Sequence, residues 1–285
     1  MRFFNRILNR QTPSKIAFVS PTPSTVDPQL KVELGNLFQS VARKFKQVSH
    51  SDPQMDEELK QRLNTMLQAE KFNGALIPDE VCRGAADLLC AHLHAIGELF
   101  RTAGFVSPAI IAPQARTILE NSALIHFLCD CDDQLRIARA MKTLKEKMQK
   151  EHADQNPRFS DFYLELSKAV ASNGPLNRGK RVKTGEYTEL IAREFGDIQG
   201  SELYAAFSGL SHHNAWVGYV HEYNVNHFPT DLELEAIDLS ANVLVIVLLT
   251  LRQLVPHRPQ TTEDQVQNIQ LLYLQLTILC QKLFN

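Results

Sequence analysis

Three polar side chains recur at four-residue intervals in the segment 203–216, LYAAFSGLSHHNAW: Tyr204, Ser208 and His212. Residues four apart lie above one another on an α-helix, so a phenol, a hydroxyl and an imidazole would form one stripe. A hydroxyl bonded to one ring nitrogen of a histidine fixes the tautomer and leaves the other nitrogen free for proton transfer. The stripe is therefore a candidate acid–base site. The alternative interpretation is a set of satisfied polar groups in a helix–helix contact.

A charged pair lies upstream, in the segment 115–127, ARTILENSALIHF, where Arg116 and Glu120 are four residues apart among mostly apolar neighbours. Charges at the edge of a buried face need partners. Either the pair neutralises itself, or it faces the polar stripe across a cleft. In the second case a guanidinium, a carboxylate and an imidazole would meet, a set suited to phosphodiester chemistry or anion binding.

The segment 177–183, NRGKRVK, supplies four cations, Arg178, Lys180, Arg181 and Lys183, and is a local candidate for binding phosphate. The alternative is an ordinary solvated loop. Because the net charge of the whole chain is only −2, no overall field attracts nucleic acid, and such binding would have to use a local patch of this kind.

The sequence contains no dinucleotide fingerprint, phosphate-binding P-loop or G-x-S-x-G motif, and no metal-ligand spacing of His and Cys. We therefore expect no cofactor and no metal. The five cysteines are odd in number and lie mostly among apolar residues, which favours free thiols in the cytoplasm. The most apolar run, 239–251, is too short to span a bilayer, so we expect a core helix and no transmembrane segment.

A resemblance to a known family rests on the segment 184–214, TGEYTELIAREFGDIQGSELYAAFSGLSHHN. It resembles bacterial helical proteins of the DUF5677 type, which are similar to the wider HEPN-like superfamily. The shared pattern is a short helix ending in Phe195-Gly196, then a tyrosine, then Ser208 and His212, with Arg116 and Glu120 upstream. The resemblance covers about 105–255.

The resemblance implies a helical bundle. Many HEPN-like proteins are metal-independent ribonucleases of toxin–antitoxin and phage-defence systems, and they usually act as dimers. In this chain Arg116 and Arg181 would hold phosphate, with Glu120 beside Arg116. His212 would be the general acid or base, oriented by Ser208 and Tyr204. The chain lacks the superfamily's arginine four to six residues before His212.

The elements that must position these residues are helical throughout. Apolar residues recur at helical spacing, alternation of period two is absent, and the composition of 44% apolar and 22% charged residues is globular. We expect about nine helices in an all-α bundle, with residues 1–27 as a flexible or extended arm and 28–285 as one domain. The expected helices begin at Pro28 and Pro53 and then cover 78–101, 108–128 (which Pro113 would break or restart), 132–152, 159–171, 186–195, 201–216, 232–254 and 263–283.

A second function follows from the same pattern. If the polar stripe is structural, the chain is a non-catalytic helical module for protein interaction or dimerisation. The helices at 232–254 and 263–283 would then bury a partner or a second copy, since a long C-terminal amphipathic helix suits a dimer interface.

Overall fold

The computed structural model describes residues 26–51, 58, 61, 65, 74–129, 133–172, 187–211, 223–258 and 263–284. Within these ranges the chain forms nine α-helices and four short 3₁₀ helices, with no strand, which confirms the all-α prediction. The α-helices are α2 (Pro28–Ser49), α4 (Ile77–Thr102), α5 (Pro108–Cys129), α6 (Asp133–Lys150), α7 (Ser160–Ser172), α9 (Tyr187–Phe195), α10 (Gly200–Ser211), α12 (Pro229–Leu254) and α13 (Glu263–Phe284).

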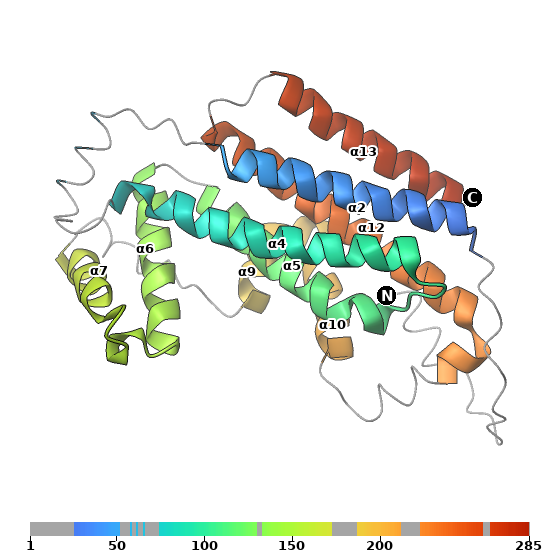
Figure 1. Ribbon diagram of the computed structural model, residues 1–285, viewed down its shortest axis with the longest axis horizontal. Coiled ribbons are helices and arrows are strands. Elements are labelled where there is room, and N and C mark those ends of the chain that lie inside the picture. The colour runs from blue at the N-terminus through green and yellow to red at the C-terminus, as the bar shows by residue number, and fades with distance from the viewer. Residues whose placement is uncertain are drawn as a thin grey trace.

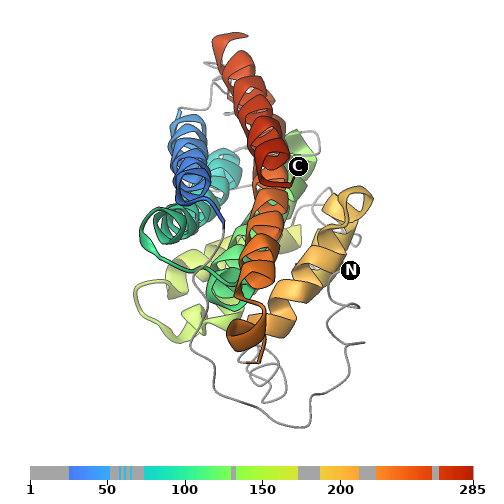
Figure 2. The same ribbon diagram turned by 90° about the vertical axis from the view of Figure 1, so that its right-hand side faces the viewer.

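Helix α5 is the centre of the bundle. It packs against α4 and α12 on one side and against α9 and α10 on another (Figures 1 and 2). Helices α2, α4, α12 and α13 run side by side as the long layer of the molecule, while α6 and α7 project at one end (Figure 1). The two segments that carry the predicted site, α5 and α10, therefore lie in contact.

Two helix starts follow from local chemistry. Asp27 caps α2 by accepting a hydrogen bond from the amide of Gln29 at 2.9 Å, and Pro28 occupies the first turn. Helix α5 is continuous through Pro113, where the sequence left a break open. Pro113 is exposed, and the helix continues past it although its missing N–H removes one backbone hydrogen bond.

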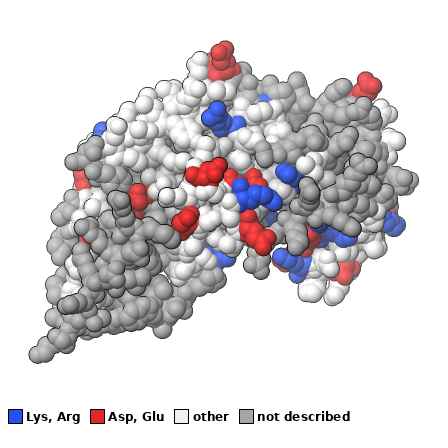
Figure 3. All heavy atoms as spheres, turned by 180° about the vertical axis from the view of Figure 1, so that it is seen from behind, with Lys and Arg blue, Asp and Glu red and all other residues white. Residues whose placement is uncertain are grey.

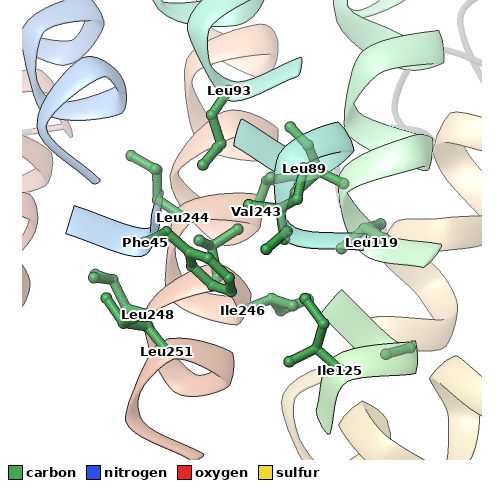
Figure 4. Close-up of a cluster of buried hydrophobic side chains, with 14 of the residues drawn as sticks. Phe45, Leu89, Leu93, Leu119, Ile125, Val243, Leu244, Ile246, Leu248 and Leu251 are labelled. Carbon is green, nitrogen blue, oxygen red and sulfur yellow. The ribbon is translucent and has the colours of Figure 1, made fainter. Parts of the chain in front are cut away.

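The apolar core forms where α2, α4, α5 and α12 meet (Figure 4). It is composed of fully or nearly fully buried side chains that follow the helical spacing of each element: Phe45, Leu89, Leu93, Leu119, Ile125, Val243, Leu244, Ile246, Leu248 and Leu251. Helix α12 is apolar on most sides because it is covered by α5, α2 and α13 together.

Two glycines let α2 and α4 approach closely. A Cβ atom added at Gly35 would lie 2.5 Å from the carbonyl oxygen of Gly97, and one at Gly97 would lie 2.9 Å from the carbonyl oxygen of Gly35. Larger residues at this crossing would push the two backbones apart.

Buried ion pairs fix the helices in register. The amine of Lys31 in α2 donates to Glu233 of α12 and to the carbonyl of Gly104, each at 2.9 Å, and both charged side chains are buried. At the other end Asp79 of α4 accepts from Arg136 of α6 at 2.8 Å and pairs with Arg258 at 3.0 Å. A buried charge without such a partner is strongly destabilising, so these pairs restrict how the helices can pack.

Candidate functional site

Glu120 holds Arg116 and Tyr204 together where α5 meets α10. One carboxylate oxygen of Glu120 accepts from Nε of Arg116 at 2.9 Å and from the hydroxyl of Tyr204 at 2.8 Å. The guanidinium carbon of Arg116 lies 5.5 Å from the centre of the Tyr204 ring. Arg116 and Glu120 thus neutralise each other, as the first interpretation has it, and Glu120 also contacts Tyr204 of the predicted stripe; the predicted meeting with the imidazole of His212 lies outside the described residues.

The surroundings of Tyr204 and Arg116 keep both side chains protonated. Burial raises the pKa of Tyr204, and the adjacent Glu120 raises it further, so the phenol keeps its proton. The hydrogen bond with Glu120 raises the pKa of Arg116, which stays a cation. One oxygen of Glu120 therefore links Arg116 of its own helix to Tyr204 of α10.

Of the remaining predicted site residues, the structure describes Ser208 but not His212 or the four cations. Ser208 lies one turn beyond Tyr204 on α10 and is half-buried, on the same side of the helix. His212 follows the last described residue of α10, and it lies outside the described residues. The four cations predicted to bind phosphate also lie outside them: Arg178, Lys180, Arg181 and Lys183.

A second polar cluster, which the sequence did not reveal, lies further along α5, where that helix meets α9. Nδ1 of His126 is 2.9 Å from Oε2 of Glu194 in α9, and Nε of Arg193 donates to Oε1 of Glu194 at 2.7 Å. Burial alone would raise the pKa of Glu194, but the hydrogen bonds from His126 and Arg193 lower it overall, so the carboxylate is ionised.

Aromatic rings hold this cluster in place. The guanidinium carbons of Arg139 and Arg193 lie 4.2 Å and 4.5 Å from the centre of the Phe127 ring, and His126 packs edge-on against Phe195. His126 is six residues beyond Glu120 on α5, which is about 9 Å along the helix. Helices α9 and α10 lie behind α5 in Figure 1, and charged side chains of both signs gather near the centre of the molecule seen from behind (Figure 3).

Only the pairing within α5 and the stripe on α10 had a local signal in the sequence. Glu194 and His126 are 68 residues apart, and no motif links them. The one available hint was that a histidine, His126, continues the apolar face of α5.

Four cysteines in the described ranges are free thiols, as expected: Cys82, Cys90, Cys129 and Cys280. The thiols of Cys82 and Cys129 are hydrogen-bonded to each other, which lowers the pKa of Cys82, and burial raises the pKa of Cys90 to about 12. Within the ranges covered by the structure, no group of three or more His, Cys, Asp or Glu side chains is placed to hold a metal ion.

The continuous helical segment Pro229–His257 is long and apolar enough to cross a membrane, with a mean hydropathy of 2.0 over its most apolar window. Of that window 61% is buried inside the protein, and the core helix of a bundle has the same length and composition. Its packing against α5 and α2 accounts for its apolar surface.

Comparisons of the chain with protein-family models, with curated proteins and with solved structures give no match. What the fold and the contacts define is an all-α multi-helix bundle with two polar clusters along its central helix, one at α10 and one at α9.

Proposed function

We propose that the chain is a cytoplasmic, HEPN-like helical protein that binds RNA and cleaves it, as a component of a bacterial stress or defence system. The proposal is supported by the contact between Tyr204 and Glu120, which joins the two halves of the family pattern. Segments 84 residues apart in the sequence meet through the residues that carry the resemblance. A purely incidental likeness in one helix would not require this contact.

In this function Arg116 holds a phosphate of the RNA backbone. Its guanidinium is oriented by Glu120 and remains partly exposed at the edge of the α5–α10 contact. Arg181 would supply a second phosphate contact, together with Arg178, Lys180 and Lys183. His212 would give or take the proton at the scissile phosphodiester, with Ser208 orienting its ring. The resemblance implies that the reaction needs no metal ion.

The test is expression of the wild-type chain, of His212→Ala and of the neighbouring control His213→Ala, followed by inspection of total cellular RNA. We expect the wild type and His213→Ala to degrade RNA and His212→Ala to leave it intact, with equal helicity by circular dichroism. Intact RNA with the wild type, or equal degradation with His212→Ala, would contradict catalysis by His212.

A second candidate function, a dimerisation module, is favoured by α13. Leu271, Leu274 and Ile278 follow the i, i+3, i+7 spacing of one helix face and are about half exposed. In an antiparallel pair of α13 helices centred on Leu274, Lys282 of one copy, which pairs with Glu33 of its own chain at 3.2 Å, would lie near the acidic first turn of the other, at Asp264. The apolar stripe and the opposite charges at its two ends thus fit a second copy of this chain.

Light scattering after size exclusion tests the dimer. We expect the wild type to be a dimer and Leu274→Glu to be a monomer. Leu164→Glu on α7 is the matched control, because both leucines are 54% exposed. A monomeric wild type, or dissociation by both substitutions, would contradict this interface.

A further inference from the structure

The buried carboxylate of Glu194 holds two more exposed side chains, those of His126 and Arg193. Its Oε2 contacts Nδ1 of His126, and its Oε1 accepts from Nε of Arg193. Both oxygens of one carboxylate are therefore used, one for each donor. Because both side chains contact the same carboxylate, the imidazole of His126 and the guanidinium of Arg193 flank Glu194.

Exposure increases from the carboxylate to the donors. The side chain of Glu194 is 6% exposed, that of His126 is 21% exposed and that of Arg193 is 45% exposed. In the part of the chain that the structure describes, Nε2 of His126 and the terminal nitrogens of Arg193 make no hydrogen bond. These atoms are the outward ends of a group whose inner end is fixed.

Both donors are held by aromatic contacts before any ligand binds. The guanidinium of Arg193 lies over the Phe127 ring, and the ring centres of His126 and Phe195 are 5.2 Å apart at an interplanar angle of 62°. Side chains that are already ordered lose less conformational entropy on binding, so a ligand gains more from each contact. A contact that only stabilised the packing of α5 against α9 would not require Nε2 of His126 and the terminal nitrogens of Arg193 to be ordered.

We propose that Nε2 of His126 and the terminal guanidinium nitrogens of Arg193 form a binding site for a phosphate group, with Glu194 as the buried group that orients both. A guanidinium offers parallel N–H donors that match phosphate oxygens. A tetrahedral phosphate has a further oxygen that can face Nε2 of His126, whose Nδ1 contacts Glu194. A planar carboxylate would already be satisfied by the arginine alone.

This site is separate from the Arg116–Glu120–Tyr204 cluster and does not depend on RNA cleavage. His126 lies about 9 Å further along α5 than Glu120 by helical rise, and its partners Arg193 and Glu194 come from α9 rather than α10. A chain that cleaves no RNA could still bind a phosphate compound here.

The test is a titration of the full chain with inorganic phosphate and then pyrophosphate at constant ionic strength, followed through the imidazole nitrogens by NMR. We expect a saturable shift of the His126 signals, and at least a tenfold loss of pyrophosphate affinity in Arg193→Ala. Arg101→Ala is the matched control, because Arg101 also pairs with a glutamate of its own helix and is 43% exposed. Its affinity should equal that of the wild type.

A His126→Asn variant should lose affinity as Arg193→Ala does, whereas His50→Asn should not, although His50 is also paired with a carboxylate. If His126→Asn fails to fold, the exposed Arg193 decides the question. The proposal is wrong if the His126 signals do not saturate, or if Arg193→Ala and Arg101→Ala weaken binding equally.

Competition with a short single-stranded RNA identifies the source of the phosphate. Displacement of pyrophosphate indicates backbone phosphates of nucleic acid, and saturable binding without displacement indicates a small phosphate compound. Both results uphold the site. Total RNA that stays intact, together with pyrophosphate bound at His126, would overturn the proposed ribonuclease and leave this site standing.

Discussion

Removal of the Tyr204 hydroxyl should destabilise the protein mainly through Glu120, with a smaller part through Arg116. In Tyr204→Phe the ring remains, and the 2.8 Å hydrogen bond to the carboxylate is lost. A hydrogen bond to a charged group contributes about 1.5–3 kcal/mol when it is well buried. Because the carboxylate is partly exposed and keeps Arg116 as a partner, we expect a cost at or just below the lower end of this range, about 1–2 kcal/mol.

A double-mutant cycle isolates this contact. Urea denaturation followed by circular dichroism at 222 nm gives the free energy of unfolding of the wild type, Tyr204→Phe, Glu120→Ala and the double variant. We expect Tyr204→Phe to cost about 1–2 kcal/mol in the wild type and nearly nothing in Glu120→Ala, so that the coupling energy equals the hydrogen bond. Tyr163→Phe on α7 is the control and should change stability by less than about 0.5 kcal/mol.

The cycle also has a result that refutes the reasoning. If Tyr204→Phe costs as much in the Glu120→Ala background as in the wild type, the hydroxyl acts through some other group. A cost near zero in the wild type would mean that α10 and α5 are not joined at this point.

Three further predictions concern the fold. Gly35→Ala should lower the free energy of unfolding by about 1–3 kcal/mol through overpacking, whereas Gly84→Ala, whose Cβ would meet nothing within 4 Å, should raise it by up to about 1 kcal/mol. Chemical denaturation of both variants measures the difference, and equal effects would contradict the close approach of α2 and α4. Lys31→Met should lower the free energy of unfolding by about 3–5 kcal/mol because Glu233 would be buried without a counter-charge, and adding Glu233→Leu should restore much of that stability. A double variant less stable than Lys31→Met would contradict this prediction. Burial raises the pKa of Glu235 from 4.5 to about 7, so folding favours its protonated form, and the wild type loses stability as the pH rises between these values. The free energy of unfolding of Glu235→Gln, relative to that of the wild type, should therefore increase by up to about 3 kcal/mol from pH 4.5 to 8, and a difference that does not depend on pH would contradict the shift.

Local patterns in the sequence predicted the nine described α-helices, while the helix expected from Pro53 and the arm expected over residues 1–27 lie largely outside the described residues. The cap at Asp27-Pro28 and the apolar spacing of α4 and α13 depend on neighbours within one or two turns, and the structure confirms them to within a few residues. The break left open at Pro113 does not occur, although a proline lacks the N–H of one backbone hydrogen bond and its ring crowds the carbonyl four residues before it. The packing of α5 against α4, α9, α10 and α12 favours a continuous helix, and local sequence does not contain that packing.

The candidate site was predictable only where its members share a helix. Arg116 and Glu120 were paired by their spacing, and Tyr204 was placed on a polar stripe by the same rule. The partners of Lys31 and His126 were not predictable, since Glu233 is 202 residues from Lys31 and Glu194 is 68 from His126. Such pairs depend on which helices meet and in which register, and each charge alone has the appearance of an ordinary surface residue in the sequence.

The central claim is that the guanidinium of Arg116, oriented by Glu120 beside Tyr204, contacts the RNA backbone. The most direct measurement is the affinity of the purified chain for a single-stranded RNA over a range of salt concentrations, compared among the wild type, Arg116→Ala and the control Arg101→Ala. We predict that Arg116→Ala weakens binding and reduces the slope of log K against log salt by about 0.7, the value for one phosphate contact to a single strand, while Arg101→Ala leaves the slope unchanged. An Arg116→Ala variant with the affinity and slope of the wild type would contradict the account.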